Sequence, residues 1–174
     1  MIEQAEHFEV FAEDGSSHGL MPRDVVHRTG AWHKACQVFV YNRQGQLLLQ
    51  QRSADKDLHP HCWDSSVGEH LKPGETFIAG AQRGLQEELG ITGVAVEPVG
   101  AEVRLSTQTA DYYDREIQQA FRCTYEGELR LAADEVAQTC WVDRAQLQQM
   151  LNEAQFTPWF LKHQERYGLI NSLS

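Results

Sequence analysis

Long hydrophobic runs and an excess of positive charge are both missing from this sequence. Its 174 residues include 15 lysines and arginines against 25 aspartates and glutamates, a formal net charge of -10. Such a surface repels the phosphates of nucleic acids and of anionic membranes, so neither is an expected partner. No apolar run approaches the roughly 20 residues that a membrane helix needs, and residues 1–7 lack the basic end and apolar stretch of a signal peptide. We therefore expect a cytoplasmic protein.

Proline and paired cysteines are also scarce. Five prolines, 41% hydrophobic residues and 23% charged residues are values of a globular chain, which excludes a disordered or fibrous protein. The cysteines form no CxxC pair, so neither a zinc ribbon nor a disulfide framework is expected. Cys36 and Cys123 lie in apolar stretches, as small buried thiols do. Cys62 lies in a polar loop, where packing beside Trp63 is the favoured interpretation and a reactive thiol the alternative.

The pattern that remains predicts strands interleaved with a few helices. The expected strands are residues 8–11, 35–41, 46–52, 94–103, 118–125 and 137–142, and the expected helices are residues 23–30, 76–89 and 144–151 and a last one that begins at Pro158. The second and third strands should form a hairpin, and their continuous apolar runs indicate burial on both faces. Residues 64–74 read as a loop. No linker or repeat divides the chain, so we expect one α/β domain over residues 1–174.

The helix expected at residues 76–89 carries two adjacent glutamates. Helical spacing places Glu87 and Glu88 on one edge and the apolar residues on another. Gly80 and Gly84 share the carboxylate edge, although an interior glycine costs about 0.5–1 kcal/mol relative to alanine, which indicates that something approaches this face closely. Two glutamates beside a glycine-containing loop suit a hard divalent cation such as Mg²⁺. An ordinary solvated pair of glutamates is the alternative.

Residues 68–75, GEHLKPGE, and residues 83–91, RGLQEELGI, together resemble the Nudix box, whose pattern is G-x5-E-x7-R-E-U-x-E-E-x-G-U with U apolar. The positions that match are Glu75, Arg83, Leu85, Glu87, Glu88, Gly90 and Ile91. Two positions depart from the pattern. Glu69 stands where the pattern opens with glycine, with Gly68 immediately before it, and Gly84 stands where the pattern has a glutamate after the arginine.

The resemblance implies a Nudix fold, a mixed sheet between helices, and hydrolysis of a diphosphate linkage with Mg²⁺ or Mn²⁺. It implies that Glu87 and Glu88 hold metal with the Gly68 carbonyl, and that Arg83 pairs with Glu75 to fix the loop on the helix. A bound cation also lets an acidic protein bind an anionic substrate. The glutamate absent at Gly84 belongs to the acid cluster in many members of the family, which implies slow turnover or a base supplied from elsewhere.

The resemblance extends beyond the box to the Nudix branch that includes isopentenyl-diphosphate isomerase, over about four fifths of the chain. That enzyme holds a metal with three histidines and two glutamates. The positions here that match are His27, His33, His70 and Glu116, with Gln118 in place of the second glutamate. Taken singly, each of these histidines is better explained by surface or core hydrogen bonding than by metal binding. Glu116 is also the candidate base, with an ordinary surface glutamate as the alternative.

Three further positions match the substrate site of that branch. Arg52 and Lys56 match its diphosphate-binding basic pair, and Trp159 matches its cation-stabilising tryptophan; a solvated strand end and a core tryptophan are the alternatives. The essential cysteine of the isomerase corresponds to Gly68, which has no side chain to move a proton.

We therefore expect a Nudix hydrolase that takes a small-molecule diphosphate of nucleotide-like or prenyl-like type. An isomerase of isopentenyl diphosphate is the disfavoured second hypothesis, and a diphosphate-binding module with lost catalysis is the third. A homodimer is possible, and the sequence does not identify the organic half of the substrate.

Overall fold

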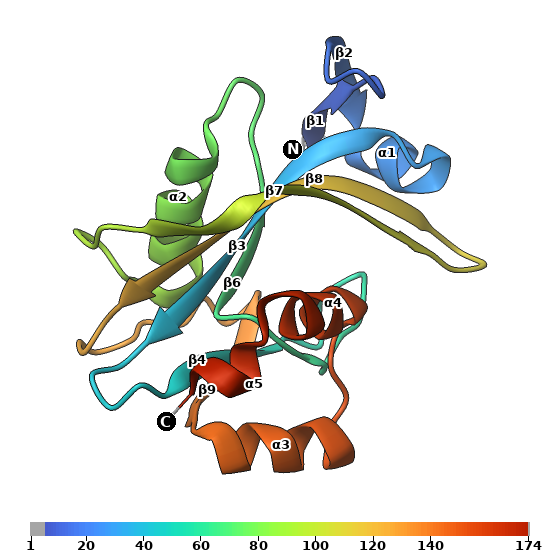
Figure 1. Ribbon diagram of the computed structural model, residues 1–174. Helices are drawn as coiled ribbons and strands as arrows, with labels where there is room; N and C mark the ends of the chain where they lie inside the picture. The colour runs from blue at the N-terminus through green and yellow to red at the C-terminus, as the bar shows by residue number, and fades with distance from the viewer. Residues whose placement is uncertain (1–5, 174) are drawn as a thin grey trace.

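The structure, a computed structural model, describes residues 6–173 and arranges them as one mixed sheet with helices on both sides (Figure 1). The strands are β1 His7–Phe11, β2 Ser17–Pro22, β3 Trp32–Tyr41, β4 Leu47–Arg52, β5 Trp63–Asp64, β6 Val67–His70, β7 Glu97–Gln108, β8 Tyr113–Thr124 and β9 Val136–Val142. The helices are α1 Arg23–Thr29, α2 Phe77–Leu89, α3 Arg144–Glu153, α4 Pro158–Tyr167 and α5 Leu169–Ser172.

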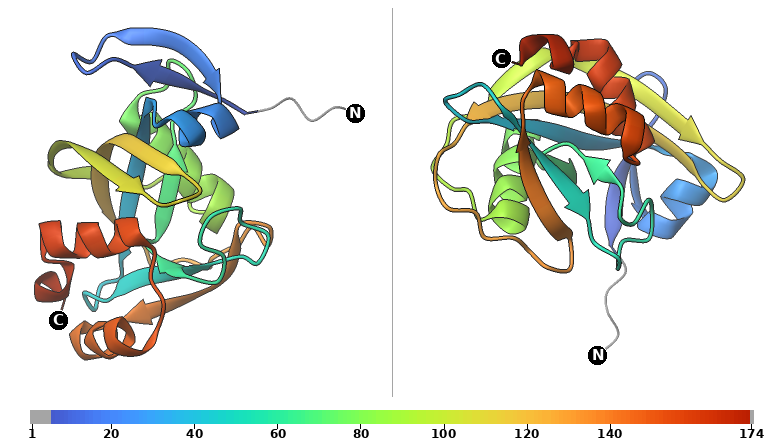
Figure 2. Two further views of the ribbon diagram at one scale, coloured as in Figure 1. Left: turned by 90° about the vertical axis from the view of Figure 1, so that its right-hand side faces the viewer. Right: turned by 90° about the horizontal axis from the view of Figure 1, so that it is seen from below.

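Strand β3 organises the sheet. It pairs in parallel with β8 and antiparallel with β1 and β6, while β7 continues the sheet beyond β8. Strand β4 touches β3 only at the Tyr41 and Leu47 pair and then joins β9 and β5. The sheet therefore divides into two parts beyond that turn, as the views of Figure 2 show. The mixed α/β architecture expected from the sequence is confirmed.

The two sheet faces are covered by different helices. Helix α2 packs on one face with Val38 and Val40 of β3, and α3, α4 and α5 pack on the other with Phe39 (Figure 1). Consecutive residues of a strand point to opposite faces, so a continuous apolar run is what a strand covered on both sides requires. All three of these side chains are essentially inaccessible to solvent.

Local signals fix the helix ends where the sequence placed them. The Thr76 side chain accepts a hydrogen bond from the Ala79 amide at 3.2 Å, which caps the start of α2. Gly90 ends the same helix with φ of 69°, a conformation that favours glycine. Asp143 caps α3 through a reciprocal pair of bonds with Gln146.

One expectation about strands was wrong, and two expected strands are present with different bounds. Residues 64–74 contain β5 and β6 rather than loop alone, and the strands expected at 94–103 and 118–125 run from Glu97 to Gln108 and from Tyr113 to Thr124. Backbone pairing sets these bounds, since β7 and β8 form a long antiparallel ladder that continues past their apolar residues. The expected hairpin turns at residues 42–45, but β6 and β8 take the edges of β3, so β4 diverges from it after one pair.

The four cysteines are free thiols, and Cys36, Cys62 and Cys123 are buried. Burial raises the pKa of each of these three thiols, as the packing interpretation of Cys62 requires. Among the residues that the structure describes, no helix is long and apolar enough to cross a membrane. Residues 1–5, on which the expectation about a signal peptide partly rests, lie outside the described residues.

His163 of α4 is fully buried between Phe39 and Tyr167, and neither ring nitrogen has a hydrogen-bond partner among residues 6–173. Burial, aided by the cations Arg166 and Lys162, lowers its pKa from 6.5 to about 4. Between these two pH values the unfolded chain binds a proton that the folded protein rejects, so the free energy of unfolding falls as pH falls, by at most about 3 kcal/mol.

We expect His163→Phe to lose less of its unfolding free energy between pH 7 and pH 4.5 than the wild type does. The phenyl ring keeps the stack on Tyr167 and removes the titration. Urea unfolding of both proteins at the two pH values measures the difference, and since the other histidines titrate in both proteins, their contribution cancels. Equal losses would contradict the assignment.

Candidate active site

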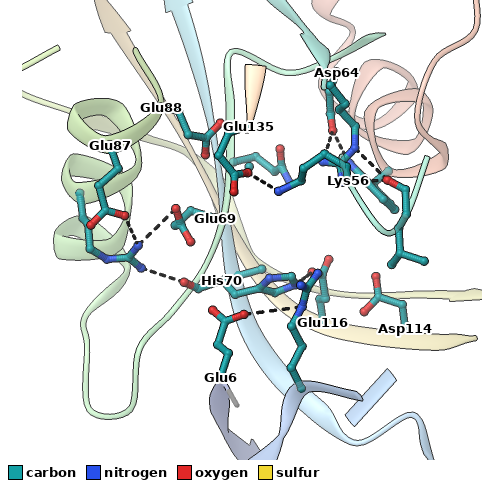
Figure 3. A pocket seen from close by; sticks show the side chains of 18 of the residues that line it. Glu6, Lys56, Asp64, Glu69, His70, Glu87, Glu88, Asp114, Glu116 and Glu135 are labelled. Atoms are coloured by element: carbon teal, nitrogen blue, oxygen red, sulfur yellow. Dashed lines mark hydrogen bonds and ion pairs between the residues drawn. The ribbon is translucent and has the colours of Figure 1, made fainter. Parts of the chain in front are cut away.

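One pocket of about 410 Å³ gathers nearly all the site residues that the sequence singled out (Figure 3). Those that line it are His27, Arg52, Lys56, Gly68, His70, Arg83, Glu87, Glu88, Glu116 and Trp159. His33 is fully buried behind the lining. The pocket lies where β4 and β5 diverge from β3 and β6, so its opposing walls come from the two parts of the sheet.

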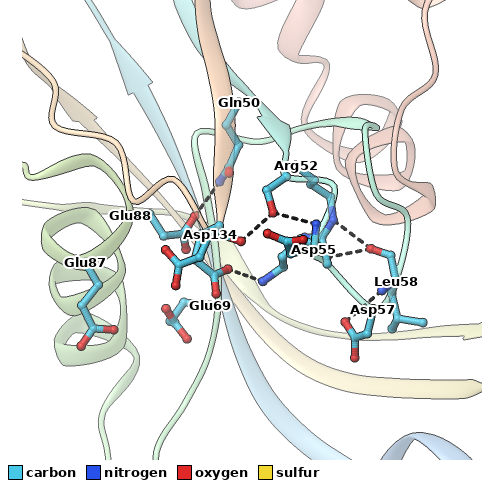
Figure 4. Close-up of polar contacts among 12 residues, drawn as sticks. Gln50, Arg52, Asp55, Asp57, Leu58, Glu69, Glu87, Glu88 and Asp134 are labelled. Carbon is cyan, nitrogen blue, oxygen red and sulfur yellow. Dashed lines mark hydrogen bonds and ion pairs between the residues drawn. The ribbon is translucent and has the colours of Figure 1, made fainter.

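Glu88 of α2 is a buried carboxylate on one wall. Its Oε2 accepts a hydrogen bond of 2.7 Å from the Gln50 amide, and its side chain belongs to a residue only 6% exposed (Figure 4). Burial raises the pKa of Glu88 well above its usual value, and the negative charge of Glu69 raises it further. A positive partner would stabilise the ionised form that this environment disfavours.

Arg83 bonds to three carboxylates and a carbonyl around the same wall. Its guanidinium donates to Glu75 Oε1 and Oε2, both at 2.9 Å, and to the Glu87 carboxylate at 3.0 Å. It also donates to the His70 carbonyl at 2.8 Å and lies 3.2 Å from Glu69 Oε2. The guanidinium fork suits such planar, bidentate contacts. Arg83 thereby fixes the loop before α2 on the helix and positions β6 beside it.

The other end of the pocket holds three histidines and two carboxylates. The ligand atoms of His27, His33 and His70 lie within 4.8 Å of one another, and so do those of His33, Asp114 and Glu116. His70 Nε2 is 3.2 Å from Glu116 Oε1, and His33 Nε2 is 3.6 Å from Asp114 Oδ1. Strand register explains the approach, because His33 on β3 stands directly opposite Glu116 on β8.

Burial determines the protonation states of this cluster. Burial lowers the pKa of His27 to about 4 and that of His70 to about 3, and it lowers the pKa of His33 well below its usual value, so the rings are neutral near pH 7. Burial and the proximity of Glu116 raise the pKa of Asp114 to about 8, and burial raises that of Glu116 to about 7. Neutral imidazoles and carboxylates are the ligands that divalent transition metals use.

Several atoms of the cluster are left without a hydrogen bond. His27 Nε2, His33 Nε2 and Asp114 Oδ1 are buried and have no hydrogen-bond partner among the described residues. The Ala31 carbonyl lies 3.1 Å from His33 Nδ1, which must therefore donate and leave the Nε2 lone pair facing the cluster. Buried polar atoms without partners are costly, and a metal ion at their centre would satisfy all three. The donor set therefore fits a metal.

The structure assigns the second carboxylate of this cluster differently from the sequence comparison. Gln118, which the resemblance put in the place of the second glutamate, donates a hydrogen bond to Glu116, and Asp114 supplies the carboxylate. Residues 114, 116 and 118 share one face of β8, since side chains alternate along a strand. The D-x-E spacing was the signal that could have identified Asp114.

The wall formed by β4 and the loop after it carries the basic pair. Arg52 donates to the Leu58 carbonyl at 3.0 and 2.8 Å and lies over the Trp159 ring at 5.4 Å. Lys56 pairs with Glu135. Trp159 donates through Nε1 to Asp64 Oδ2 at 2.6 Å, so buried Asp64 holds the tryptophan beside Arg52.

Gly68 lies on the pocket wall opposite Gln37 of β3. A Cβ at position 68 would lie 3.1 Å from both amide heteroatoms of Gln37, which is closer than most such contacts. Gln37 is buried and its Oε1 has no hydrogen-bond partner in residues 6–173. The amide therefore takes the space that a side chain at position 68 would enter.

Sequence reasoning missed several polar residues of the pocket. Those that line it are Gln37, Asp64, Glu69, Asp114 and Glu135, and Gln50 lies behind the lining, bonded to Glu88. For Asp114 the alternation along β8 was a usable signal, and for Glu69 the departure from the family pattern was one. The positions of Gln50 and Glu135 depend on the β4 and β9 pairing, which residue types alone do not reveal.

Comparison with known proteins establishes the family. The NUDIX domain family matches residues 31–160, so the chain belongs to the Nudix family. An isopentenyl-diphosphate delta-isomerase of Serratia proteamaculans is 31% identical over 150 residues, 85% of this chain and 83% of that protein. A Nudix hydrolase of Yersinia pestis is 30% identical over 134 residues, 75% of this chain and 68% of that one.

The fold has a solved counterpart as well. A crystal structure of a protein from Deinococcus radiodurans is similar with a TM-score of 0.76 and covers 93% of this chain and 99% of its own, at 19% identity. This likeness supports the Nudix fold of the chain and says nothing about its substrate.

We expect Arg83→Lys to lower the free energy of unfolding by about 2 kcal/mol, since an ammonium cannot make the paired bonds to Glu75 and also reach the His70 carbonyl. Urea unfolding measures the loss, and faster amide exchange at residues 71–75 would locate it. Arg122→Lys is the matched control, because Arg122 makes two bonds to Glu97 at an exposed site. A loss in the control as large as that of Arg83→Lys would contradict this role.

Proposed function

We propose that this chain is a divalent-metal-dependent Nudix hydrolase that cleaves a diphosphate linkage in a small-molecule substrate. The observation that carries the proposal is the pocket in which the Nudix-box carboxylates Glu87 and Glu88 face a basic wall. Arg52 and Lys56 on that wall come from a different part of the sheet. Carboxylates for a cation opposite cations for phosphate suit a substrate with two linked phosphates.

Glu69, Glu87 and Glu88 form one wall of the pocket, the acid wall. Family membership and this wall support Mg²⁺ or Mn²⁺ as the cofactor. A bound ion would polarise a phosphoryl oxygen and offset the negative charge of the substrate. Glu87 and Glu88 would hold it with the Gly68 carbonyl, as the sequence implies. Arg83 positions this group, because it ties Glu87 to the loop and to β6.

Glu116 is the candidate general base. It lines the pocket, and burial raises its pKa to about 7, close to the pH at which a base must both accept and release a proton. Its neighbours His70 and Gln118 hold the carboxyl in place. Although position 84 has no glutamate, Glu116 provides a carboxyl group whose pKa suits a general base.

Isomerase activity remains the second candidate, because the relative from Serratia carries that name. The cluster of His27, His33, His70, Asp114 and Glu116 is consistent with it. Gly68 argues against it, since that position offers no group to move a proton, and the Gln37 amide occupies the adjoining space. The sequence expectations of a single domain over residues 1–174, a homodimer and a cytoplasmic location stay predictions.

We expect Mg²⁺-dependent phosphate-ester products from a panel of nucleoside diphosphate derivatives and prenyl diphosphates, and we expect Glu88→Gln to lower kcat by about 100-fold or more. Exposed Glu153→Gln is the control and should match the wild type. Absence of hydrolysis with every substrate would reject the proposal. Proton exchange at the allylic carbons of isopentenyl diphosphate in deuterated water would favour the isomerase, and a thermal shift with substrate but no turnover would favour a binding module.

We expect the histidine cluster to bind a divalent ion that His33→Phe no longer holds. Equilibrium dialysis of the metal-free protein against Mn²⁺ or Zn²⁺ counts the ions, and the variant should bind one fewer than the wild type. His163→Phe is the matched control, since both histidines are fully buried and only His33 faces carboxylates. Equal numbers of ions in the wild type and His33→Phe would rule out the site.

A further inference from the structure

The two departures of this chain from the Nudix pattern meet in space. Glu69 lies on β6 and Gly84 lies on α2, and the two elements pack against each other. A Cβ at position 84 would lie 3.2 Å from Glu69 Cβ and 3.4 Å from Glu69 Cγ. The same Cβ would lie 2.7 Å from Val67 Cγ1, a distance that real contacts do not reach. Residue 84 therefore has no room for a side chain, and the stem of Glu69 fills part of that room.

The carboxylate of Glu69 faces the pocket rather than solvent. Its side chain is 18% exposed, and it lies with Glu87 and Glu88 on the acid wall in Figure 3 and Figure 4. Arg83 Nη1 lies 3.2 Å from Glu69 Oε2 and 3.0 Å from Glu87 Oε2, so one guanidinium holds both carboxylates.

Buried oxygen atoms of Glu88 and Gln37 lie in the same pocket, and that of Gln37 lacks a partner among the described residues. The buried Glu88 carboxylate accepts one hydrogen bond, from the Gln50 amide to its Oε2. Gln37 Oε1, on a side chain just 4% exposed that lines the pocket, has no hydrogen-bond partner within residues 6–173. Buried acceptors of this kind indicate a missing donor or cation, and hard cations take oxygen ligands and water.

We propose that Glu69 supplies, from strand β6, the carboxylate that the family pattern places at position 84 of helix α2, and that it binds the divalent cation together with Glu87 and Glu88. The third carboxylate of the acid cluster is thus kept, but it belongs to strand β6 and not to helix α2. The glycine that the pattern has at position 69 stands at position 84 instead, where Glu69 and Val67 pack against the helix. This assignment rests on the proposed function, since it concerns the same cation.

The first test measures Mn²⁺ binding alone, by isothermal titration and by electron paramagnetic resonance, on the full chain without substrate. Glu69→Gln keeps the shape and removes the charge, and we expect its dissociation constant at the Glu88-dependent site to rise at least tenfold. Glu97→Gln is the matched control, because it also removes one carboxylate paired with an arginine, Arg122, but on an exposed surface. Its dissociation constant should equal that of the wild type.

A second test moves the carboxylate back to the helix. Val67→Ala combined with Glu69→Gly and Gly84→Glu removes the clashing Cγ1 and places the charge at position 84. We expect this triple variant to bind Mn²⁺ more tightly than the Val67→Ala/Glu69→Gly double variant does. A double variant that binds as tightly as the triple variant would overturn the exchange of positions.

The outcomes separate the assignment from the proposed function. Unchanged Mn²⁺ affinity in Glu69→Gln, with affinity lost in Glu88→Gln, would overturn the role of Glu69 and leave the hydrolase proposal intact. A wild-type protein that binds neither Mn²⁺ nor Mg²⁺ at Glu88 would overturn both. A lower unfolding temperature of Glu69→Gln with unchanged affinity would show that Glu69 serves only as a structural partner of Arg83.

Discussion

The bonds of the Arg83 guanidinium are the interaction on which the site depends. One planar cation ties together α2, the loop before it and β6 through Glu75, Glu87, Glu69 and the His70 carbonyl. Because His70 also belongs to the histidine cluster, the acid wall and that cluster are positioned by the same side chain. A guanidinium can do this since its donors spread in a plane, which an ammonium cannot match. Charge-assisted bonds at a site largely shielded from water are stronger than exposed ones.

Many of the excess acidic residues are concentrated in the pocket around this arginine. The chain carries 25 acids, and nine of them line one pocket together with five lysines and arginines. Burial raises the pKa of Glu88, Glu69 and Glu116, so holding them ionised costs folding free energy. Since such a cluster lowers stability, its presence indicates a functional role. A bound cation would offset the free energy needed to keep these acids ionised.

Much of the fold followed from the sequence, because local signals determine it. The bounds of α2 and the start of α3 came from Thr76, Gly90 and Asp143, whose side chains or backbone act within a few residues. Burial on both faces of β3 followed from its apolar run. Strand β6 was missed because its four residues carry no strong strand propensity and are held by pairing with β3, a partner distant in sequence.

The site divides in the same way. Spacing selected the glutamates of the box, the family resemblance selected the histidines and the basic pair, and the pocket brings nearly all of them together. Asp114 was missed because the resemblance was aligned two residues further along β8, which put Gln118 in the place of the second carboxylate. Gln118 instead donates a hydrogen bond to Glu116, and Asp114 lies beside His33.

Gly68 stands where the resemblance to the isomerase branch places a cysteine. It has no side chain, while the histidine cluster and the basic wall around it are in place. The Gln37 amide beside it lies 3.1 Å from where a Cβ would be, so a cysteine there would require Gln37 to move. Gln37 is buried on a strand paired on both edges, so the space into which its amide could shift is limited. The chemistry of this pocket is therefore constrained by packing behind it as well as by the residues that face the substrate.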